Sequence, residues 1–102
     1  MATLTALVFL PTASKPEQVL VKPTGQGRYD TARWPLEITG LGHHLCMETE
    51  GPGNPLAERA LVALGEDPLP VPGALLLLGM DTSTTALTSL SETVIKRIMG
   101  LY

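Results

Sequence analysis

The chain has 102 residues and a formal charge of −3, with seven Lys and Arg against ten Asp and Glu, a balance that does not favour a nucleic-acid partner. Hydrophobic residues make up 44% of the sequence and charged residues 17%, which excludes a disordered chain and leaves room for a single domain, residues 1–102. The single cysteine excludes an internal disulfide bond, and the longest apolar run is too short to span a membrane, so we expect a cytoplasmic protein.

The first part of the chain predicts two strands. Residues 3–10 alternate at first and then become apolar on both faces, as an interior strand does. No Lys or Arg precedes them, which argues against the apolar part of a signal peptide. Residues 18–22 form a second short strand, which ends at Pro23 because proline has no N–H to donate to a neighbouring strand.

A hairpin is expected in the middle of the chain, after a loop. Residues 24–35 are polar and contain glycine, so we expect a loop with at most one helical turn. Residues 36–39 and 43–49 each alternate, and the sequence of residues 40–42 between them is Gly-Leu-Gly. This pattern is typical of two antiparallel strands joined by a three-residue connection.

Capping residues mark the ends of two helices. Asn54 is suited to the N-cap and Pro55 to the first helical position, and Gly65 follows the last apolar residue of this segment. Ser91 is the expected N-cap of a second helix, which ends at Gly100. Each segment carries one apolar stripe, which is typical of a helix that packs on one side only.

Between the two helices, residues 73–79 form a short apolar run bounded by glycines. Its four consecutive leucines predict a central strand covered on both faces, because a helix of this length would be marginal. Residues 81–88 are rich in Thr and Ser and are expected to be a loop.

These elements predict an α+β fold with the order ββββαβα. We expect a mixed, mostly antiparallel sheet of about five strands, with both helices on one face. The core must be mainly aliphatic, because the only aromatic residues are Phe9, Tyr29, Trp34 and Tyr102. The small core and the apolar second face of the sheet favour a homodimer, so one expected partner is a second copy of the chain.

Two motifs in the second half of the chain resemble a known family of small domains. They comprise Glu48, Glu50, Gly51, Asn54, Pro55, Leu56 and Ala60, followed by residues 73–79, Ser89, Leu90, Ser91 and Glu92. In this order they resemble domain of unknown function 3846, a family found mainly in bacteriophages and mobile elements. The family's helix after its second strand has no counterpart in the expected loop of residues 24–35. The resemblance implies an accessory role in the host-cell cytoplasm and brings no catalytic residues.

The candidate binding residues lie in the loop predicted over residues 24–35. Arg28, Tyr29, Arg33 and Trp34 belong to types that dominate interfaces when they are exposed. We expect Trp34 to fold back onto the sheet as the largest core side chain, because other aromatic residues are scarce. The alternative is an exposed loop in which these four residues contact a partner.

The residues best suited to chemistry lie on one face of the strand predicted over residues 43–49. His44, Cys46 and Glu48 alternate with apolar residues that we expect to face the core. Imidazole, thiolate and carboxylate are all zinc ligands. These positions span roughly 13 Å along a strand, however, so one ion cannot reach all three. No metal and no other cofactor is therefore favoured, and the polar side chains are expected to face water or a partner.

The sequence favours a non-enzymatic function. The expected role is that of a phage or mobile-element accessory protein that binds a host or viral macromolecule, with an unidentified protein as its partner. The first alternative is a small metal- or thiol-dependent enzyme centred on His44 and Cys46, although nothing marks an oxyanion hole or an orienting third group. The second alternative is a regulatory module that binds a small ligand through residues 25–34.

Overall fold

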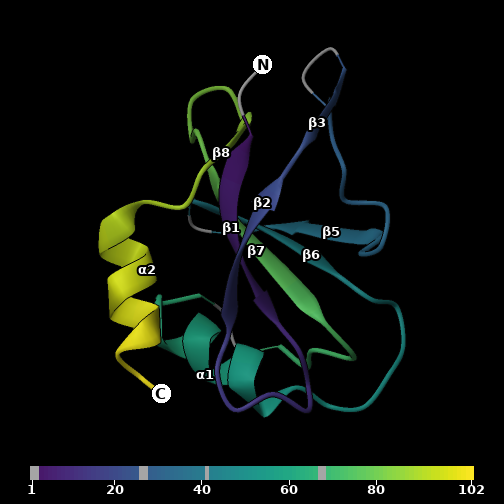
Figure 1. Ribbon diagram of the computed structural model, residues 1–102, viewed down its shortest axis with the longest axis vertical. Helices are drawn as coiled ribbons and strands as arrows, with labels where there is room; N and C mark the ends of the chain where they lie inside the picture. The colour runs from purple at the N-terminus through teal and green to yellow at the C-terminus, as the bar shows by residue number, and fades with distance from the viewer. Residues whose placement is uncertain (1–2, 26–27, 41, 67–68) are drawn as a thin grey trace.

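The molecule is built around an antiparallel sheet flanked by two helices (Figure 1). The computed structural model describes residues 3–25, 28–40, 42–66 and 69–102. In chain order the elements are β1 (Leu4–Phe9), β2 (Glu17–Val21), β3 (Pro23–Gly25), β4 (Arg28–Tyr29), β5 (Leu36–Thr39), β6 (His43–Met47), α1 (Pro55–Ala63), β7 (Leu75–Met80), β8 (Leu87–Thr88) and α2 (Glu92–Met99). The predicted α+β fold is confirmed.

The main sheet has the strand order β2-β1-β7-β6-β5, with β8 paired to the end of β7. β7 is an interior strand, as its four leucines predict, and it pairs with β1 on one side and β6 on the other. β3 and β4 form a separate two-stranded hairpin. Among the described residues, β2 and β5 are the two edge strands of the main sheet.

Two predicted loops contain short strands, which is a correction to the sequence analysis. Residues 24–35 are not irregular throughout, because β3 and β4 pair there and β3 begins at Pro23, the residue predicted to end a strand. Residues 81–88 contain β8. Strands of two or three residues are too short to show the alternation by which a strand is recognised in a sequence.

The hairpin of β5 and β6 is confirmed, but its register differs from the expected one. Thr39 pairs with His44, and Glu37 with Cys46, whereas a three-residue connection would pair Thr39 with His43. When the pairing of two strands shifts by one residue, each side chain acquires a different neighbour across the strands, from the other face of the partner strand. Glu37 therefore lies beside Cys46 on the same face of the sheet.

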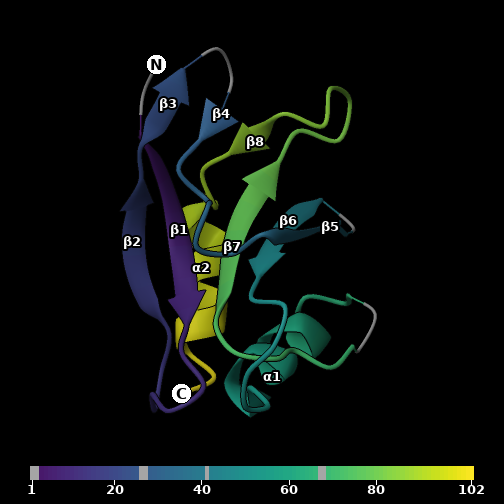
Figure 2. The same ribbon diagram turned by 90° about the vertical axis from the view of Figure 1, so that its right-hand side faces the viewer.

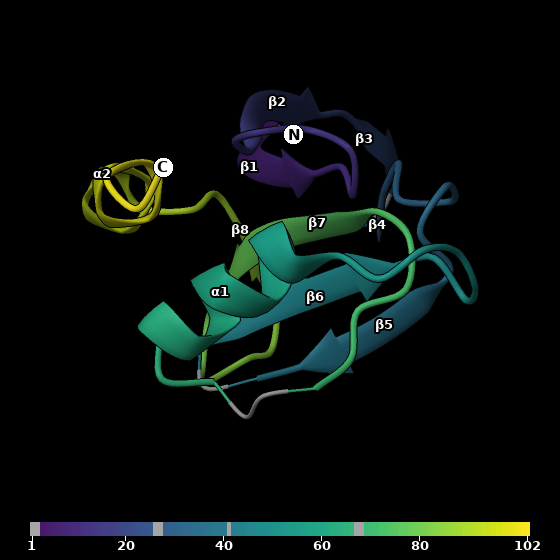
Figure 3. The same cartoon turned by 90° about the horizontal axis from the view of Figure 1, so that it is seen from below.

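Each face of the main sheet carries its own core. Alternate residues of a strand face opposite ways, so Leu75 and Leu77 pack with the helices while Leu76 and Leu78 belong to the other face. Figure 3 shows α1 against β6 and β7, with α2 beside it in end-on view. Among the described residues, no helix has the length and apolar composition needed to cross a membrane.

The face opposite the helices is covered by irregular chain and short strands. Figure 2 shows α2 behind the sheet and the segment between β4 and β5 crossing in front of it. The half-buried side chains that pack on this second core are Val19, Tyr29, Trp34 and Leu87. This arrangement places residues 30–34 directly over the sheet, where they help to form the site described below.

Asn54 connects α1 to the sheet. Its side chain is fully buried, and its Oδ1 accepts a hydrogen bond from the Ala57 N–H at 3.1 Å, as the predicted N-cap does. Its Nδ2 donates to the carbonyl oxygens of Phe9 at 2.9 Å and Gly73 at 2.8 Å. One side chain therefore joins the start of α1, the end of β1 and the segment that leads into β7.

Candidate functional site

A groove of about 460 Å³ lies on the face of the sheet opposite the helices. β1 and β2 form one side of the groove and residues 30–34 form the other. Val8, Val19 and Leu76 give it an apolar floor, and Trp34 gives it an aromatic wall. The groove therefore offers a concave surface with an apolar floor beside β2, an edge strand of the sheet.

Hydrogen bonds hold the wall of the groove in place. The Asp30 N–H donates to the carbonyl oxygen of Lys22 at 2.9 Å, which ties the segment to the end of β2. The Trp34 N–H donates to the Thr31 carbonyl oxygen at 3.0 Å and closes a turn. The Arg33 guanidinium lies 5.4 Å from the centroid of the Trp34 ring, which is a cation–π contact. This contact holds a positive charge at the wall of the groove.

Four exposed charged residues surround the groove: Glu17, Lys22, Asp30 and Arg33. Within the part of the chain that the structure describes, none of them has an ion-pair partner. Their charges sum to zero, so the rim favours neither a strongly basic nor a strongly acidic partner. Glu17, Lys22 and Asp30 were not predicted as site residues, because β2 and the loop meet only through tertiary structure.

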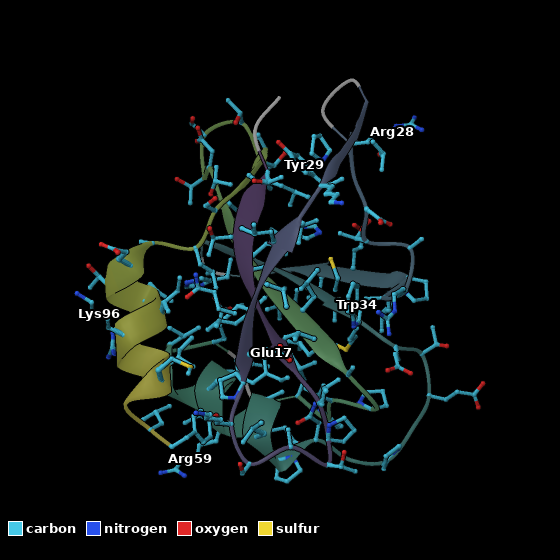
Figure 4. The ribbon with its side chains drawn as sticks, in the orientation of Figure 1. Glu17, Arg28, Tyr29, Trp34, Arg59 and Lys96 are labelled. Atoms are coloured by element: carbon cyan, nitrogen blue, oxygen red, sulfur yellow. The ribbon has the colours of Figure 1, made fainter. Side chains whose placement is uncertain are left out.

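The four predicted binding residues do not all lie at the groove. Arg33 and Trp34 line it, and Trp34 is half-buried against the second core, as expected for this residue. Tyr29 is half-buried against the same core and is not among the lining residues. Figure 4 shows Arg28 on the β3–β4 hairpin, far from Trp34.

A second cluster brings three possible metal ligands together. Glu37, His44 and Cys46 each direct one donor atom into a space where all three atoms lie within 4.8 Å of one another. The Glu37 Oε1 atom lies 3.3 Å from His44 Nε2 and accepts a hydrogen bond from the Cys46 thiol at 3.9 Å. Glu48, the third ligand candidate from the sequence, instead accepts a hydrogen bond at Oε1 from the Ala74 N–H at 3.0 Å.

Cys46 is fully buried, which corrects the prediction that it faces water or a partner. The alternation along β6 is as predicted, but both faces of the sheet are covered, so the face of Cys46 belongs to the second core. Burial, the nearby Glu37 carboxylate and the hydrogen bond to it raise the pKa of the thiol to about 12. The thiol is therefore protonated near neutral pH and is a poor nucleophile there.

His43 belongs to the other face and makes a separate contact with a glutamate. Its Nδ1 atom lies 3.1 Å from Oε1 of Glu66, whose side chain is almost fully buried. Glu66 follows α1 in the sequence, so this contact joins the end of that helix segment to the start of β6. His43 and His44 are adjacent in the sequence but serve different faces of the sheet.

The comparisons with known proteins add no family to this description. No family model, no curated protein sequence and no solved structure matches the chain.

Proposed function

We propose that the protein is a non-enzymatic accessory protein that binds an extended segment of another protein in the groove beside β2. The observation that carries the proposal is a groove with an apolar floor and an aromatic wall next to an edge strand. An edge strand offers its backbone N–H and C=O groups to an added strand, and a neighbouring groove accepts alternate side chains of that strand. The proposed setting in a phage or mobile element rests on the resemblance of the sequence motifs alone.

The groove indicates the chemistry of the segment. Apolar side chains at alternate positions would lie on the floor formed by Val8, Val19 and Leu76 and against Trp34. A carboxylate at one end of the segment would pair with the Arg33 guanidinium, which is held on the Trp34 ring and has no other ionic partner among the described residues.

A second copy of the chain is proposed to occupy the same edge when no partner is present. Leu20, in the second half of β2, is 65% exposed. Antiparallel pairing of β2 with β2 of a second copy, about a two-fold axis at Leu20, would place the two leucines side by side and continue the sheet. A partner segment and a second copy would therefore compete for β2.

The thiol-enzyme alternative has weaker support. Its nucleophile would be Cys46, whose pKa of about 12 leaves very little thiolate at neutral pH. The small-ligand alternative uses the same groove, whose volume of about 460 Å³ lies within the roughly 300–1,000 Å³ typical of ligand pockets. We favour a protein segment because the groove adjoins an edge strand, which a small molecule does not need.

The proposal is tested by selecting peptides from a random display library on the purified protein. NMR titration with a selected peptide should shift the backbone amides of β2 and the indole N–H of Trp34. Arg33→Ala should weaken binding by roughly tenfold, since an interface Arg of this kind contributes more than about 1 kcal/mol. Addition of the peptide should also dissociate any dimer, which light scattering would detect.

The matched control is Arg59→Ala. The Arg59 guanidinium lies 5.4 Å from the Tyr102 ring centroid, the same distance as in the Arg33–Trp34 pair, but it does not line the groove. This variant should leave the peptide affinity unchanged. Equal losses in the two variants, or peptide-induced shifts confined to another surface, would contradict the proposal.

A further inference from the structure

We propose that Glu37, His44 and Cys46 bind one Zn²⁺ ion per chain, in a site formed by the β5–β6 hairpin. The cluster joins a carboxylate, an imidazole and a thiol, and these are the three side-chain types that bind zinc in proteins. Its residues lie on β5 and β6, whereas the groove lies between β2 and residues 30–34. The site is therefore independent of the function proposed above.

The β-sheet register creates the cluster. Glu37 and Cys46 are directly opposite in the antiparallel pair, and His44 lies two residues from Cys46 on the same face. A residue directly opposite on the neighbouring strand lies closer to Cys46 and His44 than a third residue along their own strand can. Glu37 therefore supplies the carboxylate ligand that Glu48 cannot supply. The objection that three ligands on one strand span roughly 13 Å does not apply to this arrangement.

The distances require little movement. Zinc binds nitrogen and oxygen at about 2.0–2.2 Å and sulfur at about 2.3 Å, so ligands at tetrahedral angles lie roughly 3.3–3.6 Å apart. Glu37 Oε1 is 3.3 Å from His44 Nε2 and 3.9 Å from the Cys46 sulfur. All three separations are within 4.8 Å, so a side-chain adjustment of about 1 Å brings the donors to coordination distance.

The chemistry of binding is a proton exchange without oxidation or reduction. The Cys46 S–H bond breaks and a sulfur–zinc bond forms, while the proton passes to water or buffer. The Glu37 carboxylate supplies a lone pair from oxygen, and Nε2 of His44 supplies one when the imidazole carries its proton on Nδ1. Two charges of the ion are then balanced by one thiolate and one carboxylate.

The surroundings of the cluster give an ion access from solvent. They also keep one coordination position free of protein ligands. The Glu37 side chain is 52% exposed and that of His44 is 14% exposed, whereas Cys46 is fully buried. The ion would therefore be reached from the Glu37 side, with the thiolate beneath it. Three protein ligands leave the fourth tetrahedral position for water.

The test is titration of the purified full chain with Co²⁺, followed by competition with Zn²⁺. We expect one equivalent of Co²⁺ per chain, with a sulfur-to-cobalt charge-transfer band that Zn²⁺ abolishes. Glu37→Gln and His44→Gln should each weaken binding at least roughly tenfold, the lower limit for loss of even an indirect metal partner. Cys46→Ser should also remove the charge-transfer band.

The controls keep the proposal falsifiable even if Cys46→Ser does not fold. Glu48→Gln removes the carboxylate first suspected from the sequence while keeping an oxygen for the Ala74 N–H, and it should bind Co²⁺ like the unmodified protein. Glu37→Gln alters a half-exposed side chain, so it should stay folded. Absence of binding, binding without the thiolate band, or equal weakening by Glu37→Gln and Glu48→Gln would overturn the proposal.

Discussion

The two faces of the sheet are covered by different means. The helix face buries the larger cluster of side chains, including Phe9, Leu7 and Met47, beneath the apolar stripes of α1 and α2. The opposite face buries a smaller cluster, which includes Ala6 and Cys46, beneath a hairpin and an irregular segment. Regular helices seal one face, while the other retains the groove and the candidate metal cluster. Both faces therefore contribute a core, but both candidate sites lie on the face that the helices do not cover.

The strictest test of this comparison is to introduce a charge into each core from the same strand. Leu77→Asp enters the helix-covered core and Leu76→Asp the opposite one, and both positions are fully buried. Burying an unpaired carboxylate costs several kcal/mol, so each variant should be unfolded by circular dichroism and NMR. Val62→Asp, at a position 60% exposed on α1, is the control and should remain folded. A folded Leu76→Asp protein would show that the second face is not a core.

A smaller but still large effect is expected for Asn54→Ala. The change removes an N-cap and leaves the carbonyl groups of Phe9 and Gly73 without their side-chain donor, a loss of about 3 kcal/mol in the free energy of unfolding. Ser91→Ala removes the exposed N-cap of α2, whose Oγ accepts from the Val94 N–H, and should cost only about 1 kcal/mol. Urea denaturation measures both values. Equal losses would show that Asn54 acts as a cap alone.

Removal of Trp34 sharpens the contrast between the two covers. Trp34→Ala should cost about 2 kcal/mol, less than a fully buried aromatic residue, because this side chain is only half-buried. Hydrogen exchange should accelerate at residues 28–34 and at β8, with α1 and β7 almost unchanged. A uniform acceleration of exchange across the chain would mean that the two faces unfold together. The covers of the two faces would then not differ in their local stability.

The pH dependence of stability probes the burial of Cys46. Its thiol ionises near pH 9.0 when unperturbed, and at about 12 in the fold, so above pH 9 the unfolded state loses its proton first. The free energy of unfolding should therefore fall with rising pH, by up to about 1.4 kcal/mol per pH unit from this group. The measurement is denaturation of the metal-free protein and of Cys46→Ala between pH 8 and about 11, where the difference in slope isolates the thiol. Fast alkylation of the native thiol at pH 8 would contradict its burial.

The smallest effect on stability is expected at the edge of the sheet. Leu20→Lys replaces a side chain that is 65% exposed, so the free energy of unfolding should change by less than about 0.5 kcal/mol. Light scattering should nevertheless show a dimer for the unmodified protein and a monomer for this variant. Val62→Lys, on a comparably exposed residue of α1, should remain dimeric. A mass of 10.8 kDa for the unmodified protein at micromolar concentration would contradict the dimer proposal.

Local chemistry made much of the fold predictable. The run of four leucines between glycines predicts the interior strand β7, and the caps at Asn54 and Ser91 predict where α1 and α2 begin. Those signals act over a few residues and need no knowledge of the partner element. The strands β3, β4 and β8 were not predicted. They are held in place by the strands with which they pair, and they are too short to show an alternation of polar and apolar residues.

The candidate sites were less predictable, because they depend on how the strands pair and on which segments cover each face of the sheet. The alternation along β6 identifies His44 and Cys46 as residues of one face, but only the pairing of Thr39 with His44 reveals that Glu37 joins them. Alternation also cannot show that a second layer covers this face, so Cys46 was wrongly expected to be accessible. The groove required β2 and residues 30–34 to meet, which no local pattern contains.

The central position of β7 has a consequence for the order of events during synthesis. β1 and β6 each find their second neighbour only when β7 arrives, because β7 lies between them in the sheet. At roughly 5–20 residues per second, the ribosome adds the 27 or so residues between β6 and β7 in about 1–5 s. During that interval the β1–β2 and β5–β6 hairpins each expose a hydrogen-bonding edge that the finished sheet conceals. The nascent chain is thus at its most aggregation-prone just before the four leucines emerge.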